Sequence, residues 1–292
     1  MKNRTGHSRR VGGGGPVAPW TRRFALPLGL LVLSAVTPLA GHGQEGQEPD
    51  LPDTTTFPTH DVPVDTLAAP PHPFKAGESL RFSVQYGFIK AGSAWLEVPE
   101  VVEWHGRPAW RLVARAESNG FFDKMYKVRN RIESVWDQED RFSWRYFEDR
   151  HEGGYTANDT VIFEPDSLQM RYKNGKTYPV PGPVQDALSS FYMTRFQELP
   201  IGGQITFDYH ASRKTKPMEV RILGREKVKT PAGKFSCIVI EPMLKAGGIF
   251  KNKGRLVIWL TDDDRRMPVL MKSKVMIGSI KVVLQEVKPG HG

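Results

Sequence analysis

The chain has 292 residues, with 41 Lys and Arg, 32 Asp and Glu, and a single cysteine, Cys237. One cysteine excludes an intramolecular disulfide, and its position deep in the chain argues against a lipid anchor on an N-terminal cysteine. Strand patterns do not alternate with helix patterns, which argues against a doubly wound nucleotide-binding fold. No nucleic-acid-binding motif is present, so we expect no nucleic-acid partner.

The first 43 residues have the character of a secretory signal peptide. They contain six Lys or Arg and no acidic residue, and Arg22 and Arg23 stand directly before an apolar run from Phe24 to Val36. This run is short and interrupted by proline and glycine, so we expect no stable transmembrane span once the peptide is cleaved, at about Gly43. The protein is therefore predicted to be exported to the periplasm or envelope; an uncleaved membrane anchor is the alternative.

Residues 44–73 form a second segment with its own composition. It holds six acidic residues, seven prolines and no Lys or Arg, and such a composition buries too little apolar surface to offset the entropy of ordering. We therefore predict a disordered acidic linker here and one β-rich domain at 74–292. That domain keeps 35 bases and 26 acids, which favours an anionic partner such as lipid headgroups or an envelope polymer.

Alternation of apolar and polar residues runs through this domain. Between Leu80 and Phe88 every second residue is large and apolar, which places these side chains on one face of a strand. The rhythm recurs about a dozen times between turn residues, and one apolar face per strand is typical of antiparallel sheet. Clear examples are 110–116, 142–146, 205–209 and 280–284.

One segment has the periodicity of a helix instead. From 184 to 199 apolar residues fall at spacings of three and four, between Pro183 and Pro200. The apolar stripe needs a partner, and the sheet is the only large surface available. We therefore predict a mainly β fold, with a single curved antiparallel sheet that forms a half-open or closed barrel and the helix packed over its concave side. A β-sandwich is the alternative.

Motifs for nucleophilic or metal-assisted chemistry are lacking. Cys237 lies in an apolar strand without a neighbouring histidine and is interpreted as a buried core residue. No nucleophile elbow and no metal-ligand spacing is present, so neither a metal nor a cofactor is predicted. The run 262–264 is interpreted as an acidic turn paired with Arg265 and Arg266.

Paired carboxylates are the one enzymatic arrangement that the sequence leaves open. Such a pair would suit an enzyme that cleaves cell-wall polymer, but the sequence does not say which acids meet in space. The best candidates are Glu133, Glu148, Asp149 and His151.

Two segments, 121–129 and 245–253, mix aromatic or other apolar residues with lysines and arginine. Apolar surface on irregular segments of this kind either covers a core or contacts a ligand. Together with aromatic residues of the strands and the helix, they supply the predicted ligand-binding residues. These are Phe82, Tyr86, Phe121, Phe122, Trp144, Phe191, Phe250 and Lys251.

Six motifs stand out in this domain: YGFIKAG (86–92), SNGFF (118–122), VRNR (128–131), VQDALSSFY (184–192), TPAGKF (230–235) and IWLTDD (258–263). Together they resemble a family of bacterial exported proteins, domain-of-unknown-function family 3108. The resemblance extends over about 74–287 and implies an envelope protein with no established activity and no catalytic residues to carry over. The alternating pattern is also similar to the half-open barrels of lipoprotein carriers, which is a likeness of fold alone.

Three functions stay open at this level. The leading hypothesis is non-catalytic binding of an amphiphilic, lipid-like or polymeric ligand in the concavity of the sheet. The second is a structural module that packs against another envelope protein and has a filled interior. The third is a cell-wall-acting enzyme. Whether the interior is open or filled distinguishes the first two.

Overall fold

The computed structural model describes residues 72–291, apart from 212, 245–254 and 275–277. The predicted signal peptide (1–43), all but the last two residues of the predicted linker (44–73), and the predicted ligand-binding residues Phe250 and Lys251 lie outside the described residues.

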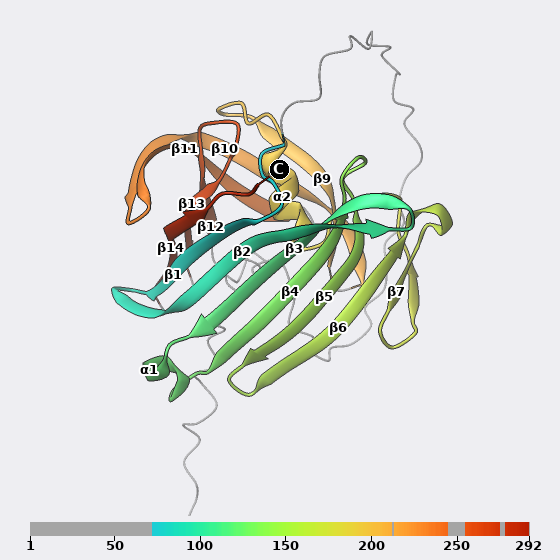
Figure 1. Cartoon of the computed structure of the whole chain (residues 1–292), viewed down its shortest axis with the longest axis horizontal. Helices are drawn as coiled ribbons and strands as arrows, with labels where there is room; N and C mark the ends of the chain where they lie inside the picture. The colour runs from blue at the N-terminus through green and yellow to red at the C-terminus, as the bar shows by residue number, and fades with distance from the viewer. Residues whose placement is uncertain (1–71, 212, 245–254, 275–277, 292) are drawn as a thin grey trace, which may run out of the picture.

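The described chain consists mainly of strands, with two short α-helices (Figure 1). The helices are α1 (Gly120–Asp123) and α2 (Ser189–Arg195), and a 3-10 turn spans Pro165–Ser167. The strands are β1 (Glu78–Tyr86), β2 (Ile89–Trp104), β3 (Arg107–Ser118), β4 (Val128–Asp137), β5 (Ser143–Glu152), β6 (Tyr155–Glu164), β7 (Gln169–Tyr172), β8 (Thr177–Pro179), β9 (Gln204–Ala211), β10 (Lys214–Thr230), β11 (Gly233–Leu244), β12 (Leu256–Thr261), β13 (Pro268–Lys274) and β14 (Ser279–Lys288).

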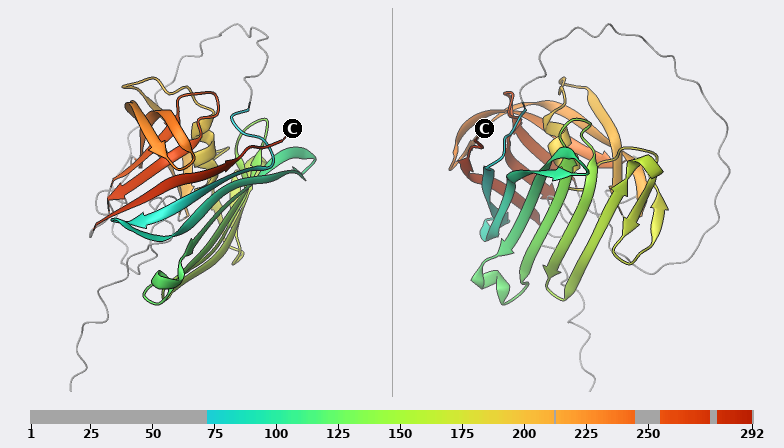
Figure 2. Two further views of the ribbon diagram at one scale, coloured as in Figure 1. Left: turned by 60° about the vertical axis from the view of Figure 1, so that its left-hand side comes forward. Right: turned by 45° about the vertical axis from the view of Figure 1, so that its right-hand side comes forward.

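All these strands belong to one antiparallel sheet in the order β8-β7-β6-β5-β4-β3-β2-β1-β14-β13-β12-β11-β10-β9. The first and last strands pair at its centre, so the edges are β8 and β9, which are neighbours along the chain. The sheet curls until its C-terminal strands face its N-terminal ones (Figure 2). Because β8 and β9 do not pair, the barrel is half-open. The predicted curved sheet is confirmed, and its continuity rules out the alternative β-sandwich.

A β-bulge in β5 changes which aromatic residues face the interior. The register of β5 against β4 shifts by one residue at Trp144. Trp144 therefore packs on the outer face with Phe142 and Val135, whereas Tyr146 packs on the inner face. The expectation that Phe142, Trp144 and Tyr146 share one side is wrong, because a bulge reverses the alternation of side chains.

The apolar rhythm of β1 also ends earlier than the sequence suggests. Leu80 and Phe82 are buried as predicted, but the strand ends at Tyr86. Gly87 has a φ of 58°, a conformation that favours glycine, and turns the chain directly into β2. Phe88 therefore stands at the tip of a two-residue hairpin loop and is fully exposed, instead of sharing the inner face.

The predicted helix at 184–199 is shorter than expected, since α2 spans only Ser189–Arg195. The residues before it are extended because Gln185 forms a parallel bridge with Tyr209 of β9. The Asp186 carboxylate then accepts hydrogen bonds from the backbone N–H groups two and three residues on, at 2.8 and 2.9 Å, which starts the helix. α2 does lie on the concave side of the sheet, as predicted.

α2 bonds to both halves of the curled sheet from inside. Towards the C-terminal half, the Arg195 guanidinium donates a hydrogen bond to the Arg265 carbonyl, between β12 and β13, at 3.1 Å. Tyr192 is fully buried, and its hydroxyl donates a hydrogen bond to the Glu97 carbonyl of β2 at 3.4 Å. Arg195 forms a buried, bidentate ion pair with Glu78 of β1, at 2.7 and 3.1 Å. An aromatic cluster fills the space between the helix and strands β3 and β4. Its members are Phe74, Trp110, Trp136, Tyr192 and Phe196.

Candidate functional site

The two ends of the sheet approach each other along a seam, which we define as the line where β7, the neighbour of the edge strand β8, faces the edge strand β9. Tyr172 of β7 meets His210 of β9 there, with 2.9 Å between the Tyr172 hydroxyl and His210 Nε2. The same hydroxyl accepts a hydrogen bond from the backbone N–H of Arg213 at 3.0 Å. The Tyr172 proton is therefore free to point at His210 Nε2, which places the imidazole proton on Nδ1, 3.2 Å from the Thr215 hydroxyl. At the seam, side-chain hydrogen bonds therefore link β7 and β9, which are not paired through their backbones.

A cavity of about 480 Å³ lies behind the seam, inside the curl of the sheet. Its size falls in the range of about 300–1,000 Å³ that is usual for small-molecule sites. The lining divides by chemistry into an apolar and a polar part. The apolar part consists of Ala157, Val161, Phe163, Ala187 and Ala211, and the polar part consists of Tyr146, Glu148, Arg150, Tyr155, Asn158, Asp159, Tyr172, Asp186, Tyr209, His210 and Arg213.

The polar wall on β5 is a chain of side chains that satisfy one another. Glu148 accepts a hydrogen bond from the Tyr146 hydroxyl at 3.1 Å and lies 3.6 Å from Arg150. Arg150 also pairs with the buried Glu152 at 2.9 Å, and Glu152 accepts a hydrogen bond from the Asn130 amide at 2.8 Å. Burial raises the pKa of Glu148 above its usual value, although Arg150 and the Tyr146 hydroxyl oppose that shift. Arg150 is thus already neutralised by its neighbours.

The seam histidine is neutral. His210 is buried, and this burial lowers its pKa to about 4, because the imidazolium would lose its hydration. A neutral imidazole suits its contacts, since Nε2 must accept the proton that the Tyr172 hydroxyl donates. The Tyr172–His210 contact is therefore a hydrogen bond between neutral groups.

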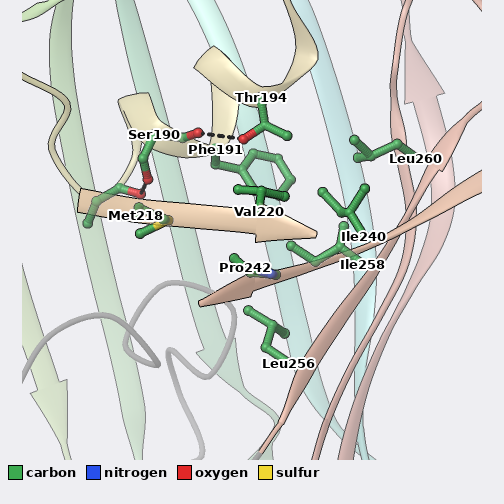
Figure 3. A pocket seen from close by; sticks show the side chains of 11 residues that line it. Ser190, Phe191, Thr194, Met218, Val220, Ile240, Pro242, Leu256, Ile258 and Leu260 are labelled. Atoms are coloured by element: carbon green, nitrogen blue, oxygen red, sulfur yellow. Dashed lines mark hydrogen bonds between the residues drawn. The ribbon is translucent and has the colours of Figure 1, made fainter. Parts of the chain in front are cut away.

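A second, apolar hollow lies between α2 and strands β10 to β12 (Figure 3). Figure 3 shows Phe191 of α2 close above Val220 of β10. The hydroxyls of Ser190 and Thr194 donate to carbonyl groups of the helix segment, at 3.1 and 2.9 Å, which leaves the hollow apolar. Its volume is about 30 Å³, room for one small group. Ala187 lines both the hollow and the cavity, so the two adjoin.

The predicted ligand-binding residues do not gather at one place. Phe191 lines the apolar hollow. Phe82 is buried in the core, and the β5 bulge turns Trp144 to the outer face. Tyr86 and Phe122 pack in a small cluster at one end of the sheet. Phe121 is exposed beside them.

The residues that close the seam were missed by reasoning from the sequence. Tyr172 and His210 stand 38 positions apart and meet only because the two sheet edges converge. In the sequence His210 is an isolated histidine without a metal-ligand spacing, and no motif includes Arg213. His210 stands out of phase with the apolar residues of β9, Ile205, Phe207 and Tyr209, so the alternation does not predict its burial.

The carboxylates considered for an enzyme lie on opposite faces of the sheet. Glu148 lines the cavity, whereas Asp149 pairs with His151 at 3.2 Å on the outer face. Glu133 is also turned outward, where it pairs with Arg111 and Arg131 at 3.4 and 2.6 Å. Since successive side chains of a strand point to opposite sides, these acids do not converge on one substrate.

Two further interpretations of single motifs are confirmed. Cys237 is fully buried, and burial raises the pKa of its thiol to about 11, so it is a core residue. In the turn at 262–264, Asp262 pairs with Arg266 at 3.5 Å and Asp263 pairs with Arg265 at 2.7 Å. Among the described residues no three or more His, Cys, Asp or Glu side chains lie close enough together to hold a metal ion.

No helix in the described part of the chain has the length and apolar character needed to cross a membrane.

No curated protein matches the sequence significantly. Among solved structures, the chain is similar to a β-barrel-like protein of domain-of-unknown-function family 1849 from Brucella abortus. The TM-score is 0.50 at 8% identity, over 75% of this chain and 99% of that one, which shows a shared fold alone. Two further likenesses have TM-scores of 0.30. They are a candidate exported protein with a YmcC-like fold from Bacteroides fragilis (14% identity, 74% and 97% of the chains) and a candidate lipoprotein from Parabacteroides distasonis (12%, 74% and 98%).

A family model matches most of the described domain. The model is that of the family called Protein of unknown function (DUF3108), and it covers residues 81–285, well over half of the chain. All six motifs of the resemblance, from 86–92 to 258–263, lie inside the matched range. The chain, a half-open antiparallel barrel with a cavity behind the seam, therefore belongs to the DUF3108 family.

Proposed function

We propose that the protein binds an amphiphile with an anionic head, without catalysis, in the cavity behind the seam. The observation that carries this proposal is a cavity of about 480 Å³ that is lined both by apolar side chains and by polar ones, among them Arg213. Burial of apolar ligand surface contributes about 25 cal/mol per Å², so the alanine, valine and phenylalanine wall favours a hydrocarbon chain. The adjoining hollow under Phe191 offers further apolar contact.

Arg213 is the residue that best suits the anionic head. Its side chain lies at the cavity lining, is exposed, and forms no ion pair with any carboxylate of the described chain. Arginine binds carboxylate or phosphate through two parallel hydrogen bonds, which fixes the orientation of such a head. Arg150 is a poorer partner because Glu148 and Glu152 already compensate its charge.

Export supports this choice of ligand. The signal peptide predicted at 1–43 would deliver the chain to the periplasm or envelope, where lipids with anionic heads are abundant. A binding protein of this kind needs no cofactor and no convergent acid–base pair, in keeping with the separation of Glu148 from Asp149 and Glu133.

One observation favours a second function, that of a structural module bound to another envelope protein. Around α2 the interior is filled, with Leu188 and Tyr192 fully buried. A module of this kind would hold no ligand, so ligand binding separates the two proposals.

Fluorescence titration with dansylaminoundecanoic acid tests the proposal. Ala157→Phe places a phenyl ring in the cavity, and we expect it to weaken binding by about tenfold or more. Thr156→Phe is the matched control, because Thr156 precedes Ala157 in β6 and points to the other face. Arg213→Gln should weaken binding of this acid but leave binding of neutral N-phenylnaphthylamine unchanged. Absence of binding by the unaltered protein, or equal binding by both phenylalanine variants, would contradict the proposal.

A further inference from the structure

Large apolar side chains are exposed together at one end of the sheet. They come from three connections, the β1–β2 hairpin, α1 with the loop after it, and the β5–β6 hairpin, which follow one another along the lower left of Figure 1. Phe88 is 100% exposed, Met125 74%, Phe121 64% and Ile89 57%. We call this set the apolar rim. Its members are Phe88, Ile89, Phe121, Met125 and Tyr155.

Backbone hydrogen bonds hold the three connections side by side. The Asn119 backbone N–H donates to the Ala91 carbonyl at 2.8 Å, and the Asn119 side chain donates to the Lys90 carbonyl at 2.6 Å, which ties α1 to the start of β2. The Gly153 N–H donates to the Lys127 carbonyl at 2.8 Å, which ties the β5–β6 hairpin to the loop after α1. The rim is therefore one surface of the fold rather than three separate loops.

The local backbone prevents these side chains from folding back. Gly87 and Gly153 have φ values of 58° and 61° and form two-residue hairpin loops, which leave Phe88 at a tip. In α1, Phe122 is buried against Ala91 and Val128, so the adjacent Phe121 must point outward. Exposed phenylalanines fixed in this way mark a contact surface.

The rim is surrounded by positive charge. Segments 87–91, 119–127, 153–156 and 278–281 hold four lysines and one acid. That acid, Asp123, pairs with Arg129 at 2.7 Å. The lysines are Lys90, Lys124, Lys127 and Lys281, and the Lys281 ammonium lies 5.9 Å from the centre of the Phe88 ring.

We propose that the apolar rim docks on the surface of an anionic lipid bilayer. Phe88, Phe121 and Met125 enter the boundary between headgroups and acyl chains, while the lysines remain among the anionic headgroups. Projecting tips suit a fluid bilayer, because each tip is accommodated separately, whereas a protein partner needs a complementary surface. Tyr155 belongs to the rim and also lines the cavity, so docking brings the cavity to the membrane. The proposal does not depend on what the cavity binds.

Flotation of the exported protein with lipid vesicles tests this docking. Vesicles of equal parts phosphatidylglycerol and phosphatidylcholine should bind the protein. Vesicles of pure phosphatidylcholine should bind it at least about tenfold more weakly. We expect the double variant Phe88→Ser/Phe121→Ser to lose binding by about tenfold or more. Val101→Ser is the matched control, since Val101 is 45% exposed and lies near the opposite end of β2. This variant should bind vesicles like the unaltered protein. Near-ultraviolet circular dichroism checks that each variant is folded.

Three results would overturn the proposal. The first is no binding of the unaltered protein to anionic vesicles, and the second is equal binding by the rim variant and the control. The third is light scattering that shows a dimer which the rim variant dissociates, without vesicle binding, since the rim would then contact a second copy of the chain. None of these results bears on fatty-acid binding by the Ala157→Phe variant, so the two proposals fail separately.

Discussion

The two halves of the barrel interior are built differently. Around α2, aromatic rings pack at centre distances of about 5 to 6 Å and leave no large space. Behind the seam, where β7 faces β9, a cavity of about 480 Å³ remains, and the polar side chains of its β5 wall are paired with one another. The difference arises because α2 fills one half, whereas the unpaired edges of the sheet leave the other half hollow. Changes in the filled half should therefore affect stability, and changes in the hollow half should affect binding.

The ion pair between Arg195 and Glu78 gives the largest expected effect in the filled half. Arg195→Ala leaves the buried Glu78 carboxylate without its partner, so we expect the free energy of unfolding to fall by about 3–5 kcal/mol. Urea denaturation measures this change. Arg81→Ala removes an exposed pair with Glu286 and should cost less than about 1 kcal/mol. Similar losses in the two variants would show that the buried pair between α2 and β1 contributes no more to stability than an exposed one.

His210 should make the seam sensitive to acid. Its pKa is lowered from 6.5 to about 4 by burial, so the unfolded chain binds the proton first as the pH falls. Stability contributed by the neutral imidazole is complete above pH 6.5 and is lost as the pH falls toward 4, by about 3 kcal/mol at 1.36 kcal/mol per pKa unit. Denaturation midpoints measured across this window should depend less on pH in His210→Gln. An unchanged pH dependence in that variant would mean that the histidine is not buried at the seam.

Replacing one alanine in each half by the larger valine compares the packing of the two halves directly. Ala114 lies in the filled half and is buried, so Ala114→Val should overpack the core and cost about 1–3 kcal/mol. Ala211 lines the cavity, so Ala211→Val has space and should change stability by less than about 0.5 kcal/mol. Thermal denaturation of both variants makes the comparison. Equal destabilisation would show that the hollow half is as tightly packed as the filled one.

Much of this fold was predictable, because side-chain alternation dictates strands. Leu80, Phe82, Trp110 and Leu112 are buried as their spacing predicts. The β-bulge that interrupts the alternation of side chains was not predicted. Nothing in the sequence signals that β5 gains an extra residue at Trp144, and a one-residue shift reverses every later side chain.

The binding site was less predictable than the fold. Its seam residues, Tyr172 and His210, come from strands at opposite ends of the sheet order and meet only through curvature. Curvature depends on twist and bulges, which local sequence does not specify. The prediction that Phe88 lies on the inner face was wrong for a related reason. The apolar alternation continues through Gly87, although the chain turns there.

Native mass spectrometry of the exported protein tests the central claim most directly. An amphiphile in the cavity predicts that the unaltered protein carries added mass, that detergent displaces it, and that Ala157→Phe carries little or none while Thr156→Phe carries as much as the unaltered protein. A bare polypeptide mass for the unaltered protein, purified without detergent, would contradict ligand binding and favour a structural role.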